Sequence, residues 1–181
     1  MDSGWRKSLR NRNEAVTNVK VWQFVSIFLW ALVAGVFWGP WLGLSRSISS
    51  FSPEAFLAIG KTMIRNLAPV MPFLMIAAIA SMLPVLIISY RQRSDMFMLT
   101  LVSFALVITA LMITLLVEVP IDNQIKMWTV NSLPGDWREI RDRWETFHVL
   151  RTSASVGGLA LMLAAALFSR RATDRTQEYS L

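Results

Sequence analysis

The sequence is poor in cysteine, histidine and charge. It has no cysteine, a single histidine (His148) and only 17% charged residues among 181. The lack of cysteine excludes thiol catalysis, iron–sulfur ligation and structural disulfides. One imidazole is also too few for the ligand sets typical of zinc, copper or haem proteins, so we expect no metal site. An average soluble domain has about 25% charged residues, and a chain with 54% hydrophobic residues departs clearly from that composition.

The sequence also lacks the short motifs of several protein classes. No G-x-S-x-G segment provides the nucleophile elbow of a serine hydrolase, and no phosphate loop or dinucleotide fingerprint occurs. The net charge of +6 is the one feature that suggests a nucleic-acid binder. Because the Lys and Arg residues are spread over loops, without a basic stripe and interleaved aromatic residues, we expect no nucleic-acid partner.

What the chain has instead is four stretches without any charged residue. These stretches are 21–45, 66–90, 96–117 and 152–169. About 20 apolar residues in a helix cross the roughly 30 Å hydrocarbon layer, so each stretch is long enough to span a lipid bilayer. The sequence therefore predicts an all-α fold, an integral membrane four-helix bundle. We expect a membrane domain at 21–169 with spans at about 21–45, 66–90, 96–118 and 146–169.

The distribution of Lys and Arg predicts how these spans are oriented. The tails 1–20 and 170–181 and the turn 91–95 together carry ten of the 18 cations, although they are short. The positive-inside rule then predicts that both tails are cytoplasmic and that the protein lies in the inner membrane of a bacterium. The first span is too long for the core of a signal peptide, so it is expected to stay attached.

The first extracytoplasmic segment contains a helix start at Ser52, where the hydroxyl caps the helix and Pro53 takes the first helical position. Apolar residues then recur at helical spacing opposite the charged ones. They are Phe56, Ile59, Met63, Ile64 and Leu67. This pattern predicts an amphipathic extracytoplasmic helix that lies at the interface and runs into span two. Within span two, Pro69, Pro72 and Pro84 are expected to interrupt the hydrogen-bond ladder.

Small residues recur along one side of the first and fourth spans. The two seams are Ala31, Gly35, Gly39 and Gly43, and Ser153, Gly157, Ala160 and Ala164. Because small residues let helix backbones approach closely, we expect spans one and four to pack through these seams. The same glycines would also suit the dimerisation of two chains, and the sequence leaves the oligomeric state open.

The fourth span is preceded by a polar helix. Asp136 and Glu139 form a capping-box pattern, and the helix that begins there is expected to continue into span four as one long helix. One face of it is rich in polar and aromatic side chains. That face carries Trp137, Arg141, Trp144, His148, Arg151 and Ser155. Its tryptophans also fit a simple aromatic belt at the membrane surface, and its arginines fit side chains that snorkel to water.

Partners for this face follow the third span. Glu118, Asp122 and Asn123 occur around Pro120, which is expected to bend or stop the helix near the membrane surface. Polar groups at such a place are costly unless they are paired. We therefore expect Glu118 or Asp122 to pair with Arg151, with His148 beside them.

The segment 119–152 also carries a resemblance. It contains Pro120-Ile121-Asp122 after the third span and Trp144-x-x-x-His148-x-x-Arg151 at the entry to the fourth. These motifs resemble a family of small four-span bacterial membrane proteins, mostly of unassigned function, whose superfamily includes the anthrone oxygenases of aromatic polyketide pathways. Those oxygenases carry Pro-x-Asn and Trp-x-x-x-Asn-x-x-Arg at the two places. Asp122 and His148 stand where the oxygenases tend to have Asn.

The resemblance implies oxygenation of an anthrone-like or phenolic hydrophobic substrate without a cofactor, since a deprotonated anthrone reacts directly with O₂. The catalytic residues that it implies are His148, as the base, and Arg151, Asn123 and Asp122. For substrate binding it implies a second group, in which an indole N–H donates and aromatic rings stack on the substrate. This second group consists of Trp144, Glu118, Trp38 and Trp41.

Two other classes of function remain open at this level. The first is a non-enzymatic membrane protein that binds a lipid, a quinone-like molecule or a partner protein, with the polar cluster as a structural latch. The second is a transporter, which the absence of an internal repeat disfavours. An enzyme needs a pocket beside His148, whereas a latch needs His148 to be saturated by its neighbours.

Overall fold

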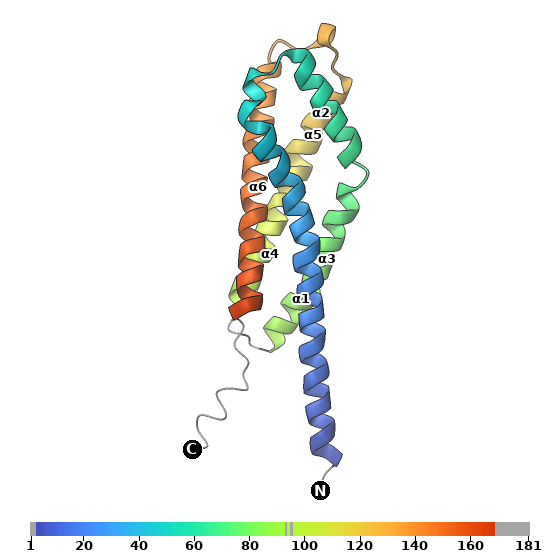
Figure 1. Cartoon of the computed structure of the whole chain (residues 1–181), viewed down its shortest axis with the longest axis vertical. Helices are drawn as coiled ribbons and strands as arrows, with labels where there is room; N and C mark the ends of the chain where they lie inside the picture. The colour runs from blue at the N-terminus through green and yellow to red at the C-terminus, as the bar shows by residue number, and fades with distance from the viewer. Residues whose placement is uncertain (1–2, 93, 95, 169–181) are drawn as a thin grey trace.

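The structure is a computed structural model that describes residues 3–92, 94 and 96–168, with side chains described from residue 19 onward. The described residues form helices and short connections without a strand, and the long helices run side by side (Figure 1). The long helices are α1 (Ser3–Gly43), α3 (Met71–Arg91), α4 (Phe97–Ile113) and α6 (Trp137–Phe168). The shorter elements are η1 (Ser45–Ser50), α2 (Pro53–Leu67), η2 (Thr114–Glu118), α5 (Val119–Met127) and η3 (Val130–Ser132). The predicted tail at 170–181 lies outside the described residues.

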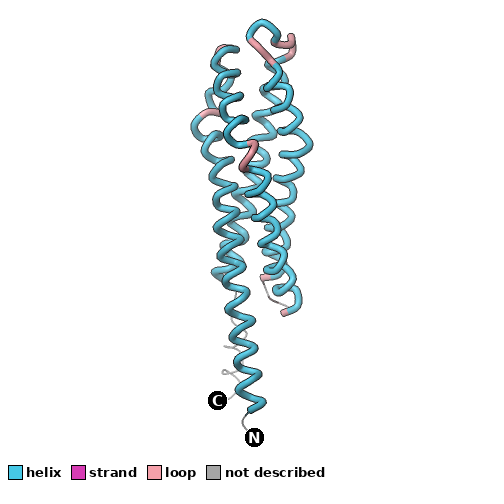
Figure 2. The backbone as a smooth tube through the Cα atoms, turned by 90° about the vertical axis from the view of Figure 1, so that its right-hand side faces the viewer, coloured by secondary structure: helices cyan, strands magenta, loops and turns pink. Residues whose placement is uncertain are grey.

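Four helical segments are long and apolar enough to cross a membrane. They are Val19–Ser50, Met71–Arg91, Phe97–Met127 and Trp137–Phe168. The prediction of an all-α four-helix membrane bundle with a long fourth helix is therefore confirmed. The start of α1 projects well beyond the other helices (Figure 2), at the end of the bundle at which α6 also ends (Figure 1).

The four long helices form a closed ring in which α1 packs on α3, α3 on α4, α4 on α6, and α6 on α1. The core contains Trp30, Val33, Phe37, Met75, Ala78, Met82, Val107, Ala110 and Met162. Bonds from side chains to backbone carbonyls tie neighbouring helices together. Ser26 donates to the carbonyl of Ser81 at 2.7 Å, Trp30 to Ser155 at 2.9 Å, and Ser103 to Gly158 at 2.7 Å. Such bonds stabilise helix pairs where water is absent.

The helix predicted from Ser52 onward is present as α2. The Ser52 hydroxyl accepts from the backbone N–H of Ala55 at 3.3 Å, and hydrogen bonds from the backbone and from Ser52 lower the pKa of Glu54 below its ordinary value. However, α2 does not run into span two, because the chain turns at 68–70 and α3 begins at Met71. Pro72 lacks the N–H that a continuous helix requires, so the prolines separate two helices instead of kinking one.

Of the two effects expected of Pro120, a bend or a stop of the helix, the stop does not occur. The span runs from Phe97 to Met127, with one π-helical turn, η2, just before the proline. In that turn the N–H of Val119 donates to the carbonyl of Thr114, five residues earlier. The wider turn shifts the hydrogen-bond register ahead of the proline, and the helix therefore continues as α5.

The glycine seam of α1 does not pack against α6. A Cβ atom added at Gly35, Gly39 or Gly43 would meet nothing within 4 Å, so these glycines face outward. The close approach is made by Gly158 of α6, where an added Cβ would lie 3.4 Å from the carbonyl oxygen of Ser103 in α4. The seam prediction was wrong because the large side chains Trp30 and Phe37, on the other side of α1, occupy the bundle interior.

A second apolar cluster closes the end of the bundle that holds η1, α2 and α5. It consists of Ile48, Phe56, Leu57, Ile64, Ile121, Ile125, Trp128 and Trp137. Trp128 and Trp137 are buried within it, so these two tryptophans are part of a core rather than of an aromatic belt. We call this part of the molecule the α2 end.

Candidate functional site

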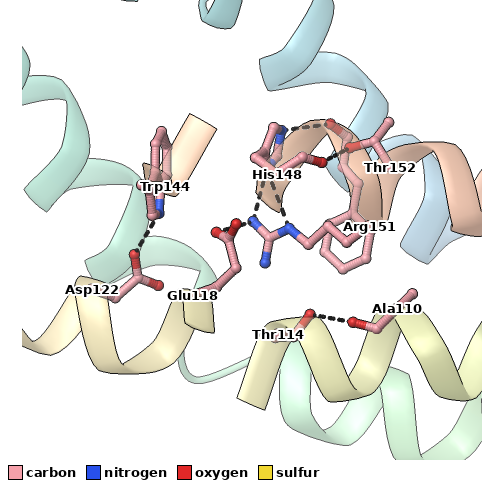
Figure 3. Close-up of polar contacts among 9 residues, drawn as sticks. Ala110, Thr114, Glu118, Asp122, Trp144, His148, Arg151 and Thr152 are labelled. Carbon is pink, nitrogen blue, oxygen red and sulfur yellow. Dashed lines mark hydrogen bonds and ion pairs between the residues drawn. The ribbon is translucent and has the colours of Figure 1, made fainter. Parts of the chain in front are cut away.

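The polar face predicted on α6 is turned into the bundle just below the α2 end. Four side chains of this face are buried, namely Trp137, Arg141, His148 and Ser155. Two others are half-buried, namely Trp144 and Arg151. Glu118 and Asp122 lie opposite, on η2 and α5 (Figure 3). Glu118 is the last residue of the π-helical turn η2, and its side chain is 0% exposed.

Arg151 is the centre of the cluster. Its Nη2 atom lies 2.9 Å from Oε2 of Glu118, and its Nε and Nη2 atoms lie 3.2 and 2.8 Å from Nδ1 of His148. Its guanidinium carbon also lies 4.5 Å from the centre of the Phe37 ring, within the range of a cation–π contact. The predicted pairing of Arg151 with an acid, with His148 beside it, is confirmed, and the acid is Glu118.

These contacts determine the tautomer of His148. An arginine only donates, so Nδ1 of His148 accepts, and the ring proton lies on Nε2. Nε2 is 3.1 Å from the carbonyl oxygen of Phe37, to which it donates. The hydroxyl of Thr152 in turn donates to the carbonyl of His148 at 2.7 Å. Both ring nitrogens of His148 are therefore engaged, and its side chain is only 2% exposed.

Glu118 is the unusual member of the cluster. Although Arg151 supplies a counter-charge, neither carboxylate oxygen accepts a hydrogen bond from the described residues. The Nε and Nη2 groups of Arg151 donate to His148, and Nη2 faces Oε2 of Glu118 as an ion pair only (Figure 3). A fully buried carboxylate without a donor is costly, so this position is suited to a proton or to a donor group of a ligand.

Trp144 connects Asp122 with His148. Its indole N–H donates to Oδ1 of Asp122 at 3.1 Å, and its ring stacks on the His148 ring with 5.7 Å between centroids and 14° between planes. On α6 these two side chains are one turn apart, which is the spacing that allows stacking. Asp122 is thus tied to the same face of α6 as Glu118, one helical turn further along the chain.

A small apolar hollow lies at the α2 end, next to Trp144. Its volume is about 20 Å³, which is room for about one water molecule. The end of α1, η1 and α2 line it together with Trp144, and none of the lining side chains is charged. Sequence reasoning missed this hollow, because its walls come from four separate elements.

Three residues predicted for the site lie elsewhere. Asn123 is exposed, and its Oδ1 accepts from Nζ of Lys126 at 3.0 Å, so it points away from the cluster. Trp38 is 43% exposed and packs against Trp41, with 4.9 Å between ring centroids. Successive residues of a helix differ by about 100° in direction, so burial of Phe37 turns Trp38 outward. The Phe37 carbonyl, which holds His148, has no signal in the sequence because every residue carries one.

Metal-ligating side chains do not gather in this cluster. In the part of the chain that the structure describes, no group of three His, Asp or Glu side chains lies close enough together to hold a metal ion. The chemistry available in the cluster is that of an acid or base, a guanidinium and aromatic rings.

Comparison with protein families matches residues 61–161 to the family described as anthrone oxygenase. That segment is more than half of the chain. The chain belongs to the anthrone oxygenase family. Comparisons with curated proteins and with solved structures find no match. In this anthrone oxygenase family member, the matched segment includes Glu118, Asp122, Trp144, His148 and Arg151, whereas the walls of the hollow contributed by α1 and η1 lie outside it.

Proposed function

We propose that this membrane protein is an oxygenase that converts an anthrone-like or related phenolic hydrophobic substrate into a quinone with O₂. The observation that carries the proposal is the fully buried Glu118 carboxylate, which lies beside Arg151 and accepts no hydrogen bond from the described residues. Family membership supports this reaction class.

The reaction balances without an added reductant. A base removes a proton from the methylene group of the anthrone, and the resulting carbanion reduces O₂ and forms a C–O bond to it. Protonation gives a hydroperoxide, and loss of the second methylene proton then breaks the O–O bond. The products are a carbonyl on the former methylene carbon and one molecule of water. The methylene carbon supplies all four electrons that O₂ accepts, so the proposed reaction needs no cofactor.

The geometry suits Glu118 as the base. Its oxygens are free to accept a proton, whereas both nitrogens of His148 already hold hydrogen-bond partners. This differs from the role that the resemblance implies for His148. In the proposal His148 is a positioning residue, which directs the Nε and Nη2 groups of Arg151.

Arg151 is suited to stabilise the oxyanion of the enolate. Its Nη1 group makes no bond to the residues drawn in Figure 3, which leaves two N–H donors for a substrate oxygen. A guanidinium that is held in place before the substrate arrives stabilises developing charge without reorganising. Before a substrate binds, Asp122 holds the Trp144 indole against His148.

The test is turnover of dithranol, a dihydroxyanthrone, by the detergent-solubilised protein. Oxygen uptake and quinone absorbance are followed above the spontaneous oxidation that occurs in detergent alone. We expect the wild type to accelerate both signals equally and the Glu118→Gln variant to lose the acceleration. Equal rates with wild type, variant and empty detergent would refute the proposal.

A non-enzymatic role is a second candidate, and one observation favours it. His148 is nearly completely buried and saturated by its neighbours, as a structural latch would be. In that case the protein binds a quinone-like molecule or a lipid without converting it. Binding of danthron, the quinone that corresponds to dithranol, together with an absence of oxygen uptake would support this second candidate.

The proposal includes a location in the cytoplasmic membrane of a bacterium, with cytoplasmic tails at 1–20 and 170–181 on either side of the membrane domain at 21–169. The concentration of Lys and Arg in the two tails and in the turn 91–95 supports this orientation. Reporter fusions at the C-terminus test it. A fluorescent protein should be bright there and alkaline phosphatase inactive, and the reverse pattern would refute the orientation.

A further inference from the structure

The apolar hollow and the polar cluster meet at one side chain, Trp144. Its indole lines the hollow, stacks on His148 and donates a hydrogen bond to Asp122. The hollow is lined by apolar side chains, among them Ile48, Phe56 and Ile59, together with the small residues Ser45 and Gly60. Trp144 therefore belongs to both environments, one apolar and one polar.

The hollow as it stands is too small for a polycyclic molecule. Its volume is about 20 Å³, whereas pockets for ligands of that size have volumes of about 300–1,000 Å³. Trp144 is the side chain that both lines the hollow and belongs to the cluster. This tryptophan is half-buried, and the single hydrogen bond of its indole goes to Asp122.

The contacts of the indole indicate the chemical features of a ligand that would take its place. The indole is a flat aromatic system that stacks nearly parallel on an imidazole and offers one hydrogen-bond donor to a carboxylate. A phenolic polycycle has the same features, because its rings are flat and its hydroxyl group donates. The absence of charge in the walls of the hollow further favours a neutral, apolar ring system over an anionic one.

We propose that Trp144 occupies the place of the substrate, and that a planar polycyclic phenol binds by displacing the indole, stacking on His148 and extending its rings into the hollow. The inference rests on the proposed function for the identity of the substrate. In the bound state the hydroxyl donates to Asp122 in place of the indole N–H. Trp144 is thus a specificity-determining residue and the partition between hollow and cluster.

Binding of danthron tests this inference separately from turnover, with equilibrium dialysis of the full-length protein in detergent. The Trp144→Ala variant should bind danthron about tenfold more tightly than the wild type, because no indole has to be displaced. The Ile59→Trp variant should bind it about tenfold more weakly, because the new ring fills the hollow. Matched controls are Trp22→Ala and Ile76→Trp, which change exposed positions on the outer side of the bundle and should bind like the wild type.

The outcomes separate the inference from the proposed function. Equal or weaker binding by Trp144→Ala, or unchanged binding by Ile59→Trp, overturns the inference even if dithranol is turned over. If the variants bind danthron as expected but the wild type does not turn over dithranol, the inference is upheld and the proposed oxygenase activity is refuted. If Trp144→Ala does not yield a folded protein, Trp144→Leu replaces it, with the same expected sign.

Discussion

Arg151 and Glu118 form an ion pair at 2.9 Å in which the arginine directs its hydrogen bonds elsewhere, to Nδ1 of His148. The charge of the Glu118 carboxylate is therefore neutralised, but its oxygens accept no hydrogen bond from the described residues. This combination distinguishes the pair from a structural salt bridge, in which the carboxylate oxygens accept the N–H groups directly. It leaves a buried acceptor beside an arginine whose Nε and Nη2 groups are already bonded to His148.

The first prediction concerns the stability of this pair. Arg151→Ala removes the counter-charge of a fully buried carboxylate and should lower the free energy of unfolding by about 3–5 kcal/mol. The double variant Arg151→Met with Glu118→Leu removes both charges and should regain most of that loss. Thermal unfolding in detergent measures both, and Arg143→Ala, an exposed arginine of the same helix, is the control. An Arg151→Ala protein as stable as the control would contradict the pairing.

The second prediction concerns the proposed base. Glu118→Gln keeps the shape of the side chain but removes its ability to take up a proton, so dithranol turnover should fall by about 10²–10⁴-fold. Danthron binding should change little, since the size of the cluster is preserved. Glu139→Gln, an exposed acid on α6, is the matched control. Turnover within a few-fold of the wild type would remove Glu118 from the mechanism.

The third prediction separates a positioning role of His148 from a basic one. An asparagine at this position still accepts from Arg151 through its oxygen and donates through its nitrogen, but it is not a base. We therefore expect His148→Asn to keep turnover within about tenfold of the wild type and His148→Leu to lose it. Initial rates of oxygen uptake measure this difference. Complete inactivity of a folded His148→Asn protein would assign the base to His148.

The fourth prediction tests which glycines are needed for helix packing. Gly158 lies against the Ser103 carbonyl and the side chains of Leu106 and Val107, so Gly158→Leu should force α4 and α6 apart and cost about 1–3 kcal/mol. Gly35→Leu makes the same change on the outward side of α1, where an added Cβ meets nothing within 4 Å. Its melting temperature should stay close to that of the wild type. Equal losses in both variants would indicate that the Gly35 side of α1 is also packed.

Much of the site was predictable because its residues share a helix. The spacing of Trp144, His148 and Arg151 places them on one face whatever the rest of the chain does, since a helix repeats about every 3.6 residues. A charged face at membrane depth needs a partner, and the acids that follow span three were the nearest candidates. The choice of Glu118 over Asp122 could not be made from this pattern. It depends on the direction in which η2 and α5 point their side chains.

The prolines and Asn123 show why residue type alone, without its surroundings, is a poor guide to local structure. Prolines at 69 and 72 separate α2 from α3, whereas Pro120 lies within a continuous span, because a π-helical turn precedes it. Asn123 has a suitable side chain for an active site, but its neighbour at helical spacing, Lys126, binds it at the surface. In both cases local hydrogen bonds decide the structure, and the propensity of a residue type carries no information about them.

The sequence alone determined the number of membrane crossings and the polar face of α6. Both follow from one-dimensional patterns, because the bilayer excludes charge over a set thickness and the helix repeats at a set interval. Only the tertiary structure decided that Glu118 is left without a hydrogen bond, that the Phe37 carbonyl takes the proton of His148, and that Trp144 closes a hollow at the α2 end. These features arise where side chains from different helices meet, and the directions of their bonds depend on how the helices are packed against one another.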